Sequence, residues 1–163
     1  MPSCPVAKMV NRVEFLSPHS GSWVAWLRGD HDEIAYIQQQ VTISAGAPYL
    51  VYYHWIASQD ICGWDYGDVL INGSVVDEYE LCTDNNTGGW VKHSVNLSAY
   101  AGESVTLQIR VETDSVINSN LFVDDVSLQA SASSSALIED LPLNMDASTA
   151  EGKTGNVTQG EKP

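Results

Sequence analysis

Asn118-Ser-Asn-Leu-Phe-Val-Asp-Asp-Val-Ser-Leu-Gln129 is the most informative segment of this sequence. Its alternation predicts a strand with one acid and three apolar side chains on the same face: Phe122, Asp124, Val126 and Leu128. A desolvated carboxylate is costly unless it is neutralised, and a hard cation such as Ca²⁺ suits an oxygen ligand. Asp124 is therefore expected to bind calcium, or else to lie at the frayed start of the strand and cap a turn.

The residues ahead of this segment also read as short strands separated by turns. Residues 104–112 alternate cleanly between apolar and polar, and Asn72-Gly73 is a strong hairpin signal inside residues 68–77. Four further strands are predicted in residues 23–28, 35–43, 49–57 and 90–97, and a short edge strand in residues 13–16. No amphipathic helix is evident, so the pattern predicts an all-β fold, a two-sheet antiparallel jelly-roll sandwich, with a barrel as the alternative.

Composition divides the chain into three parts. Residues 1–21 read as an irregular segment, residues 22–129 as the jelly roll, and residues 130–163 as a linker followed by an acidic, extended C-terminal tail. Two tail segments, 136–143 and 155–159, are expected to be able to dock as strands on the same chain or on a neighbour. Head-to-tail docking between copies would produce a homo-oligomer or polymer.

Charge limits the classes of partner. The net charge of −14 at pH 7 argues against nucleic acid, because phosphates would be repelled. No apolar run approaches the roughly 18 residues that span a bilayer, so membrane insertion is not expected. The first residues lack the basic and apolar regions of a signal peptide, so Met1 is read as a mature, processed or internal start.

Cysteine usage indicates an extracellular or cell-surface location. Cys62 and Cys82 flank the predicted hairpin, and a disulfide closing this loop of about 20 residues would stabilise the fold by roughly 3 kcal/mol. Cys4 is left over as a free thiol, as one half of an intermolecular bridge, or with a partner upstream of this sequence.

Acidic loops supply further candidate ligands. Gly29-Asp-His-Asp-Glu33 offers Asp30 and Asp32 at a spacing that suits calcium, and either could join Asp124, although a solvated turn would have the same composition. Asp60 and Asp65 bracket Cys62, where they could bind a second cation or pin an exposed loop.

Aromatic residues and sequons give the remaining candidates. A platform for stacking a polysaccharide could be formed by Tyr53, Trp55, Trp64 and Tyr66; core packing is the alternative for all four. His54 is interpreted as a satisfied core histidine. N-glycosylation sequons occur at Asn72, Asn85, Asn96 and Asn156, and the Asn85 loop is the best acceptor.

A family resemblance covers about residues 18–129. It is carried by six motifs in order: Ser20-Gly-Ser-Trp-Val-Ala-Trp-Leu27, Tyr36-Ile-Gln-Gln-Gln-Val-Thr-Ile43, Ser58-Gln-Asp-Ile-Cys-Gly-Trp-Asp-Tyr66, Gly89-Trp-Val91, Leu97-Ser-Ala-Tyr-Ala-Gly102 and the 118–128 segment. Together they resemble a jelly-roll accessory module of secreted bacterial proteins, MAM-like or carbohydrate-binding-module-like, found behind immune-inhibitor-A-type metallopeptidases. The resemblance implies a non-catalytic module with structural calcium bound at Asp124.

Two functions are weighed on these grounds. The first is a non-catalytic structural or adhesive subunit that assembles into a filament through its tail. The alternative is a carbohydrate- or protein-binding accessory module of a larger secreted hydrolase. An enzyme is not expected, because the sequence has no nucleophile elbow, zinc-protease helix motif or phosphate-binding glycine loop.

Overall fold

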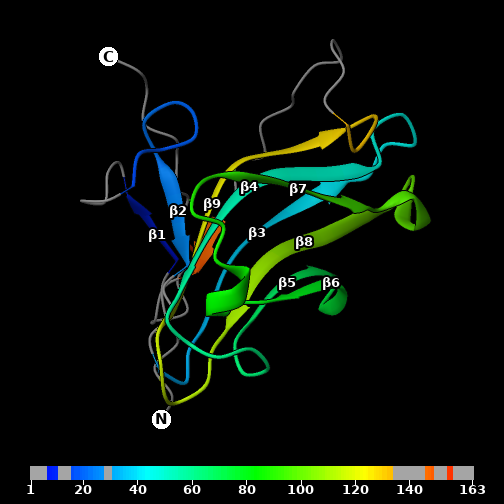
Figure 1. Cartoon of the computed structure of the whole chain (residues 1–163). Coiled ribbons are helices and arrows are strands. Elements are labelled where there is room, and N and C mark those ends of the chain that lie inside the picture. The colour runs from blue at the N-terminus through cyan, green and yellow to red at the C-terminus, as the bar shows by residue number, and fades with distance from the viewer. Residues whose placement is uncertain (1–6, 11–15, 28–30, 134–145, 149–153, 156–163) are drawn as a thin grey trace.

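The protein folds into two antiparallel β-sheets packed face to face, which confirms the predicted all-β sandwich (Figure 1). The computed structural model describes residues 7–10, 16–27, 31–133, 146–148 and 154–155, and only the backbone of the first and the last two of these ranges. Within the described residues, the five-stranded sheet has the order β1-β2-β9-β4-β7 and the six-stranded sheet the order β11-β10-β3-β8-β5-β6.

The strand bounds follow the turn signals of the sequence. The five-stranded sheet contains β1 Ala7–Val10, β2 Val24–Leu27, β4 Tyr49–Ser58, β7 Val91–Asn96 and β9 Ser119–Gln129. The six-stranded sheet contains β3 Ile34–Thr42, β5 Tyr66–Ile71, β6 Ser74–Glu80, β8 Ser104–Glu112, β10 Asp146–Ser148 and β11 Thr154–Gly155. Two short 3₁₀ helices, η1 Thr83–Asn85 and η2 Ser98–Tyr100, interrupt the connections. In the described residues, no helix is long and apolar enough to cross a membrane.

The core between the sheets is formed by alternate residues of each strand. β8 buries the four aliphatic side chains that its alternation predicted: Val105, Leu107, Ile109 and Val111. The predicted hairpin is also present, since Ile71 pairs with Ser74 across Asn72 and Gly73, whose φ angles of 51° and 82° are those that a tight two-residue turn requires.

Strand β9 departs from simple alternation at a β-bulge. Val51 pairs with Ser127 and Tyr53 with Asp124, so two residues of β9 lie opposite Tyr52, and Asp125 has a φ of 50°. The expectation that Phe122, Asp124, Val126 and Leu128 share one face is therefore wrong. Phe122 and Asp124 lie on the outer face of the five-stranded sheet, while Val126 and Leu128 pack against the core.

The outer face of the five-stranded sheet carries a second, smaller apolar cluster. Leu16, Val24 and Phe122 are buried there, and partly buried aromatic and aliphatic side chains surround them: Trp26, Trp55, Ala57 and Trp90. Segment 16–20, which precedes β2, lies over this face, because Trp90 Nε1 donates a hydrogen bond to the Ser17 carbonyl and the His19 ring stacks on Tyr53 at 3.6 Å. Segment 16–20 thus covers part of the outer face of this sheet.

Part of the C-terminal tail joins the six-stranded sheet in the same chain. β10 pairs with β3 through Ala147 and Ile37, and β11 pairs with β10. The expected tail strand 136–143, and all but residue 155 of the segment 155–159, lie outside the described residues. The same is true of residues 13–15 in the expected first strand; Leu16 is described and is buried.

Candidate functional site

Three connections meet at one end of the sandwich (Figure 1). They are residues 59–65 between β4 and β5, residues 113–118 between β8 and β9, and the turn 31–33 ahead of β3. The Gln59 amide donates to the Asn118 carbonyl at 3.3 Å, and the Asp32 amide donates to the Asp114 carbonyl at 2.7 Å. The Asp114 amide in turn donates to Asp65 Oδ1 at 2.8 Å, so hydrogen bonds join all three connections.

These connections bring three carboxylates together. Asp60, Asp65 and Asp114 each place one carboxylate oxygen within 4.8 Å of the others, and this group could hold a metal ion. Asp60 is 3% exposed and Asp65 is 1% exposed, whereas Asp114 is partly exposed. A pair of carboxylates at this spacing repels by about 3.5 kcal/mol at an effective dielectric constant of about 20.

The hydrogen bonds of this acid trio leave two oxygens without partners. Asp60 Oδ1 accepts from the Ile61 amide at 2.7 Å, and Asp114 Oδ1 accepts from the Val116 amide at 2.9 Å. Asp60 Oδ2 and Asp65 Oδ2 are buried and have no hydrogen-bond partner. Among the described residues, none of the ion pairs reaches the trio. Asp60 and Asp65 thus each keep one desolvated acceptor that makes no hydrogen bond.

The electrostatics of the site disfavour a charged Asp65. Burial raises the pKa of Asp65 above its usual value, and the neighbouring Asp60 and Asp114 carboxylates raise this pKa further. The Ser119 hydroxyl and the Asp114 amide act in the opposite direction. At neutral pH the trio therefore needs compensating positive charge or a shared proton.

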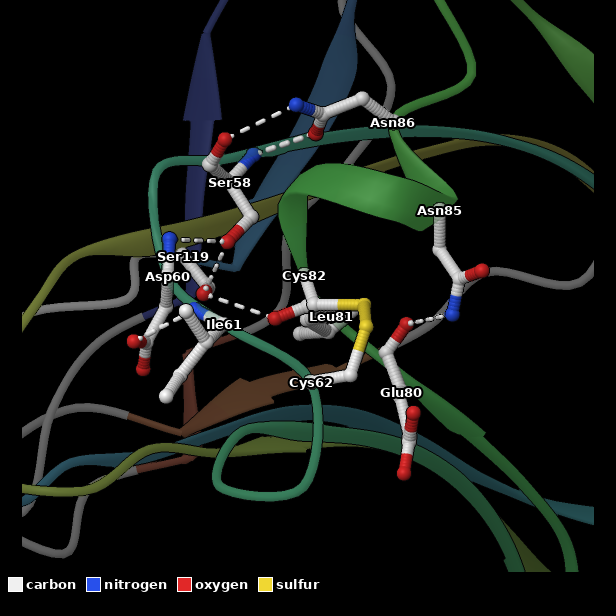
Figure 2. The surroundings of a disulfide bond; sticks show 10 residues. All are labelled: Ser58, Asp60, Ile61, Cys62, Glu80, Leu81, Cys82, Asn85, Asn86 and Ser119. Atoms are coloured by element: carbon white, nitrogen blue, oxygen red, sulfur yellow. Dashed lines mark hydrogen bonds between the residues drawn. A yellow bond between two sulfur atoms is a disulfide. The ribbon is translucent and has the colours of Figure 1, made fainter.

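A disulfide braces the 59–65 loop, as predicted (Figure 2). Cys62 and Cys82 are bonded with their Cα atoms 4.9 Å apart. Next to Cys82, the Leu81 carbonyl accepts a hydrogen bond from the Ser119 hydroxyl at 3.0 Å, and this hydroxyl lies 2.8 Å from the Ser58 hydroxyl. The disulfide consequently fixes the loop to residues 81–82, which the Ser119 hydroxyl joins to β9.

Exposed apolar side chains extend from the same loops. Ile61 is 65% exposed and Trp64 55% exposed on the 59–65 loop, while Val116 is 62% exposed on the adjoining 113–118 loop. A large aromatic side chain held in water on a cross-linked loop is a recurrent feature of ligand-binding surfaces. These residues and the acid trio define the loop-end site.

Asp124 lies elsewhere, beneath segment 16–20. Its Oδ2 accepts hydrogen bonds from the amides of His19 at 2.8 Å and Ser20 at 3.3 Å, and its Oδ1 accepts from the Asp125 amide at 2.8 Å. Burial raises the pKa of Asp124, the Asp125 carboxylate adds to this rise, and the three amides oppose it. In the described residues, Asp124 belongs to no group of three close metal-ligating side chains.

The acidic turn ahead of β3 lies near the trio. Asp32 is exposed, with a φ of 53°, and its amide contacts Asp114. Asp30 lies outside the described residues. Calcium binding by Asp30, Asp32 and Asp124 stays a prediction.

The four candidate platform aromatics belong to different surfaces. Tyr53 and Trp55 are on the outer face of the five-stranded sheet, where Tyr53 is covered by His19 and Trp55 meets Trp90 at 6.0 Å. Trp64 is in the 59–65 loop and Tyr66 begins β5 in the other sheet. Trp64 is the most exposed of the four; the role of each in glycan binding stays a prediction.

Three of the four sequon asparagines lie at exposed positions. Asn72 is in the β5–β6 turn, Asn85 ends η1, and Asn96 ends β7. Asn156 is outside the described residues, and glycosylation stays a prediction for all four.

Comparisons with known proteins support the fold. No protein-family model and no curated protein matches the sequence. Among solved structures, TmCBM61 in complex with β-1,4-galactotriose aligns over 74% of this chain and 79% of its own, with a TM-score of 0.51 and 17% identity. This chain shares its fold. SGBP-B from a xyloglucan utilization locus in Bacteroides uniformis aligns with a TM-score of 0.48 and 13% identity, over 74% of this chain and 44% of its own.

Proposed function

We propose that this chain is a non-catalytic carbohydrate-binding module that contacts its glycan at the loop-end site. The observation that carries the proposal is the 55% exposure of Trp64 on a loop fixed by the Cys62–Cys82 disulfide. An exposed, pre-positioned indole offers a flat apolar surface to a sugar ring and loses little entropy on binding. The similarity to a module bound to β-1,4-galactotriose supports the same class of ligand.

The proposal includes an extracellular location and a structural calcium ion. A disulfide is typical of oxidising compartments, and an acidic surface with buried carboxylates suits a calcium-rich exterior. A place beside a larger secreted hydrolase, as the accessory modules that this sequence resembles have, is part of the proposal.

Filament assembly is the weaker reading. In the described part of the tail, β10 pairs with β3 of the same chain, so this strand needs no second copy. Nothing among the described residues favours exchange between chains over pairing within one chain. The first hypothesis, a polymerising structural subunit, therefore ranks below glycan binding.

The test is affinity electrophoresis and calorimetry on a polysaccharide panel that includes β-1,4-galactan. The wild-type chain is expected to bind at least one member, and Trp64→Ala is expected to weaken that binding by about tenfold or more. Val75→Ala is the matched control, because Val75 is 47% exposed on β6, outside the loops of the site. Unchanged affinity in Trp64→Ala would move the glycan to another surface, and absence of binding across the panel would refute the proposed function.

A further inference from the structure

We infer that Asp60, Asp65 and Asp114 form a calcium site that fastens the 59–65 loop to the 113–118 loop. The inference assigns residues to the structural calcium ion of the proposed function, and it does not depend on glycan binding. Asp65 and Asp114 are 49 residues apart in the sequence, yet the carboxylates of the acid trio converge within 4.8 Å. Such convergence of like charges requires a compensating partner.

The oxygens without partners are the observation that points to a ligand. Asp60 and Asp65 are each more than nine-tenths buried, and each presents an Oδ2 atom that accepts no hydrogen bond. A buried acceptor normally has a partner, so two such atoms in one three-residue group fit a shared cation better than a single hydrogen-bond donor.

The donor set favours calcium over other metals. All three ligands are carboxylate oxygens, which suit a hard cation, and oxygens up to 4.8 Å apart can contact one Ca²⁺ at its usual bond length of about 2.3–2.6 Å. Mg²⁺ requires bonds of about 2.0–2.1 Å and would need the carboxylates to move closer if they span the full 4.8 Å. Cys62 and Cys82 are consumed in the disulfide, so they supply no thiolate for zinc.

Asp124 differs from the acid trio in how its buried charge is compensated. Three backbone amides already donate to the Asp124 carboxylate, which compensates its buried charge without a metal. The acid trio has the same number of amide donors, one for each carboxylate, for three carboxylates instead of one. The two locations therefore make opposite predictions for isosteric Asp→Asn variants.

Calcium titration of the full-length chain tests the site. Calorimetry after EDTA treatment and dialysis should show one equivalent of Ca²⁺, and calcium at several millimolar should raise the melting temperature, since extracellular modules bind with dissociation constants of about 0.1–1 mM. Tb³⁺ luminescence excited through tryptophan should appear on loading and fall in Trp64→Phe, because Trp64 precedes Asp65.

Variants separate a metal site from a merely structural cluster. Asp65→Asn and Asp114→Asn should lose the calcium response and, without calcium, melt at or above the wild-type temperature, because each removes like-charge repulsion. Asp124→Asn and the exposed Asp32→Asn are the controls and should keep the response. A wild-type chain that neither binds calcium nor shifts its melting temperature overturns the inference. So does loss of the response in Asp124→Asn while both trio variants retain it. Lower calcium-free melting temperatures in both trio variants, with no calcium response in the wild type, would assign the trio a purely structural role.

Discussion

Gly67 lies directly beneath the ring of Tyr79. The two residues pair across β5 and β6, and a Cβ atom added at Gly67 would fall 2.5 Å from Cε2 of Tyr79. The Tyr79 hydroxyl lies 3.2 Å from the Tyr52 hydroxyl in the core, so the hydroxyl end of the ring is confined between Gly67 and Tyr52. Gly67 does not have a positive φ, and the close contact is therefore what requires glycine at this position.

Gly67→Ala is expected to destabilise the fold by about 1–3 kcal/mol, because the added methyl group overpacks the core against Tyr79. Urea denaturation followed by tryptophan fluorescence measures this change. Gly89→Ala is the control: a Cβ there meets nothing within 4 Å and Gly89 has no positive φ, so its effect should stay within about 0.5 kcal/mol. Equal effects of the two variants would contradict the packing argument.

The lowered pKa of His54 predicts that the folded protein loses stability in acid. Burial, and then the neighbouring His93, lower the pKa of His54 from 6.5 to about 4. The folded state therefore binds this proton less readily than the unfolded chain. Its contribution to stability is intact above pH 6.5 and is lost as the pH falls from about 6.5 toward 4. The loss should reach about 2 kcal/mol at about pH 5.

The measurement compares urea unfolding of the wild type and His54→Phe at about pH 7.5 and at about pH 5. The difference in unfolding free energy between the two proteins should shift by about 2 kcal/mol toward the variant on acidification. A difference that does not change with pH would show that His54 titrates normally in the fold.

Removal of the Cys62–Cys82 disulfide should cost about 3 kcal/mol, from the entropy of a loop with a sequence separation of 20. The double variant Cys62→Ala/Cys82→Ala and the reduced wild type should unfold at similar, lower urea concentrations. Reductant should leave the double variant unchanged. A double variant as stable as the oxidised wild type would mean that Ser58 and Ser119 hold the loop without the bond.

Arg110 should be required for stability, because it compensates the buried charge of Asp68. Its Nε and Nη2 atoms donate to Asp68 Oδ2 at 2.9 Å and 2.5 Å, and the Asp68 side chain is 2% exposed. Arg110→Met leaves that carboxylate buried without its partner and should cost about 3–5 kcal/mol. Adding Asp68→Asn to Arg110→Met should recover part of the loss. Glu112 also pairs with Arg110 but is exposed, so Glu112→Gln should change stability by less than about 0.5 kcal/mol.

The fold could be predicted wherever local sequence and tertiary environment agree. β8 alternates because one of its faces is core and the other is outside the sandwich, and Asn72-Gly73 supplies the positive φ angles of a tight hairpin from two residues alone. β9 could not be predicted in the same way. The bulge at Asp125 depends on pairing with β4, and a residue count along one strand carries no information about its partner.

The acid trio as a group of three could not be predicted from the sequence either. Asp60 and Asp65 were visible as acids bracketing Cys62, but Asp114 belongs to another connection, and only the register of β8 between β3 and β5 brings it to them. The sequence offered both Trp55 and Trp64 as platform candidates, and only the tertiary structure separates Trp64, which is 55% exposed, from Trp55, which is partly buried beside Trp90.

Segment 16–20 has a practical consequence for dissecting the chain. A recombinant fragment that starts at residue 22 would lack Leu16, the stacking of His19 on Tyr53, and two of the amides that donate to Asp124. Its outer sheet face would expose Phe122 to water and become adhesive toward other copies. Aggregation of so short a fragment would then reflect the cut and say nothing about how the intact protein associates, so cloning boundaries have to lie upstream of Leu16.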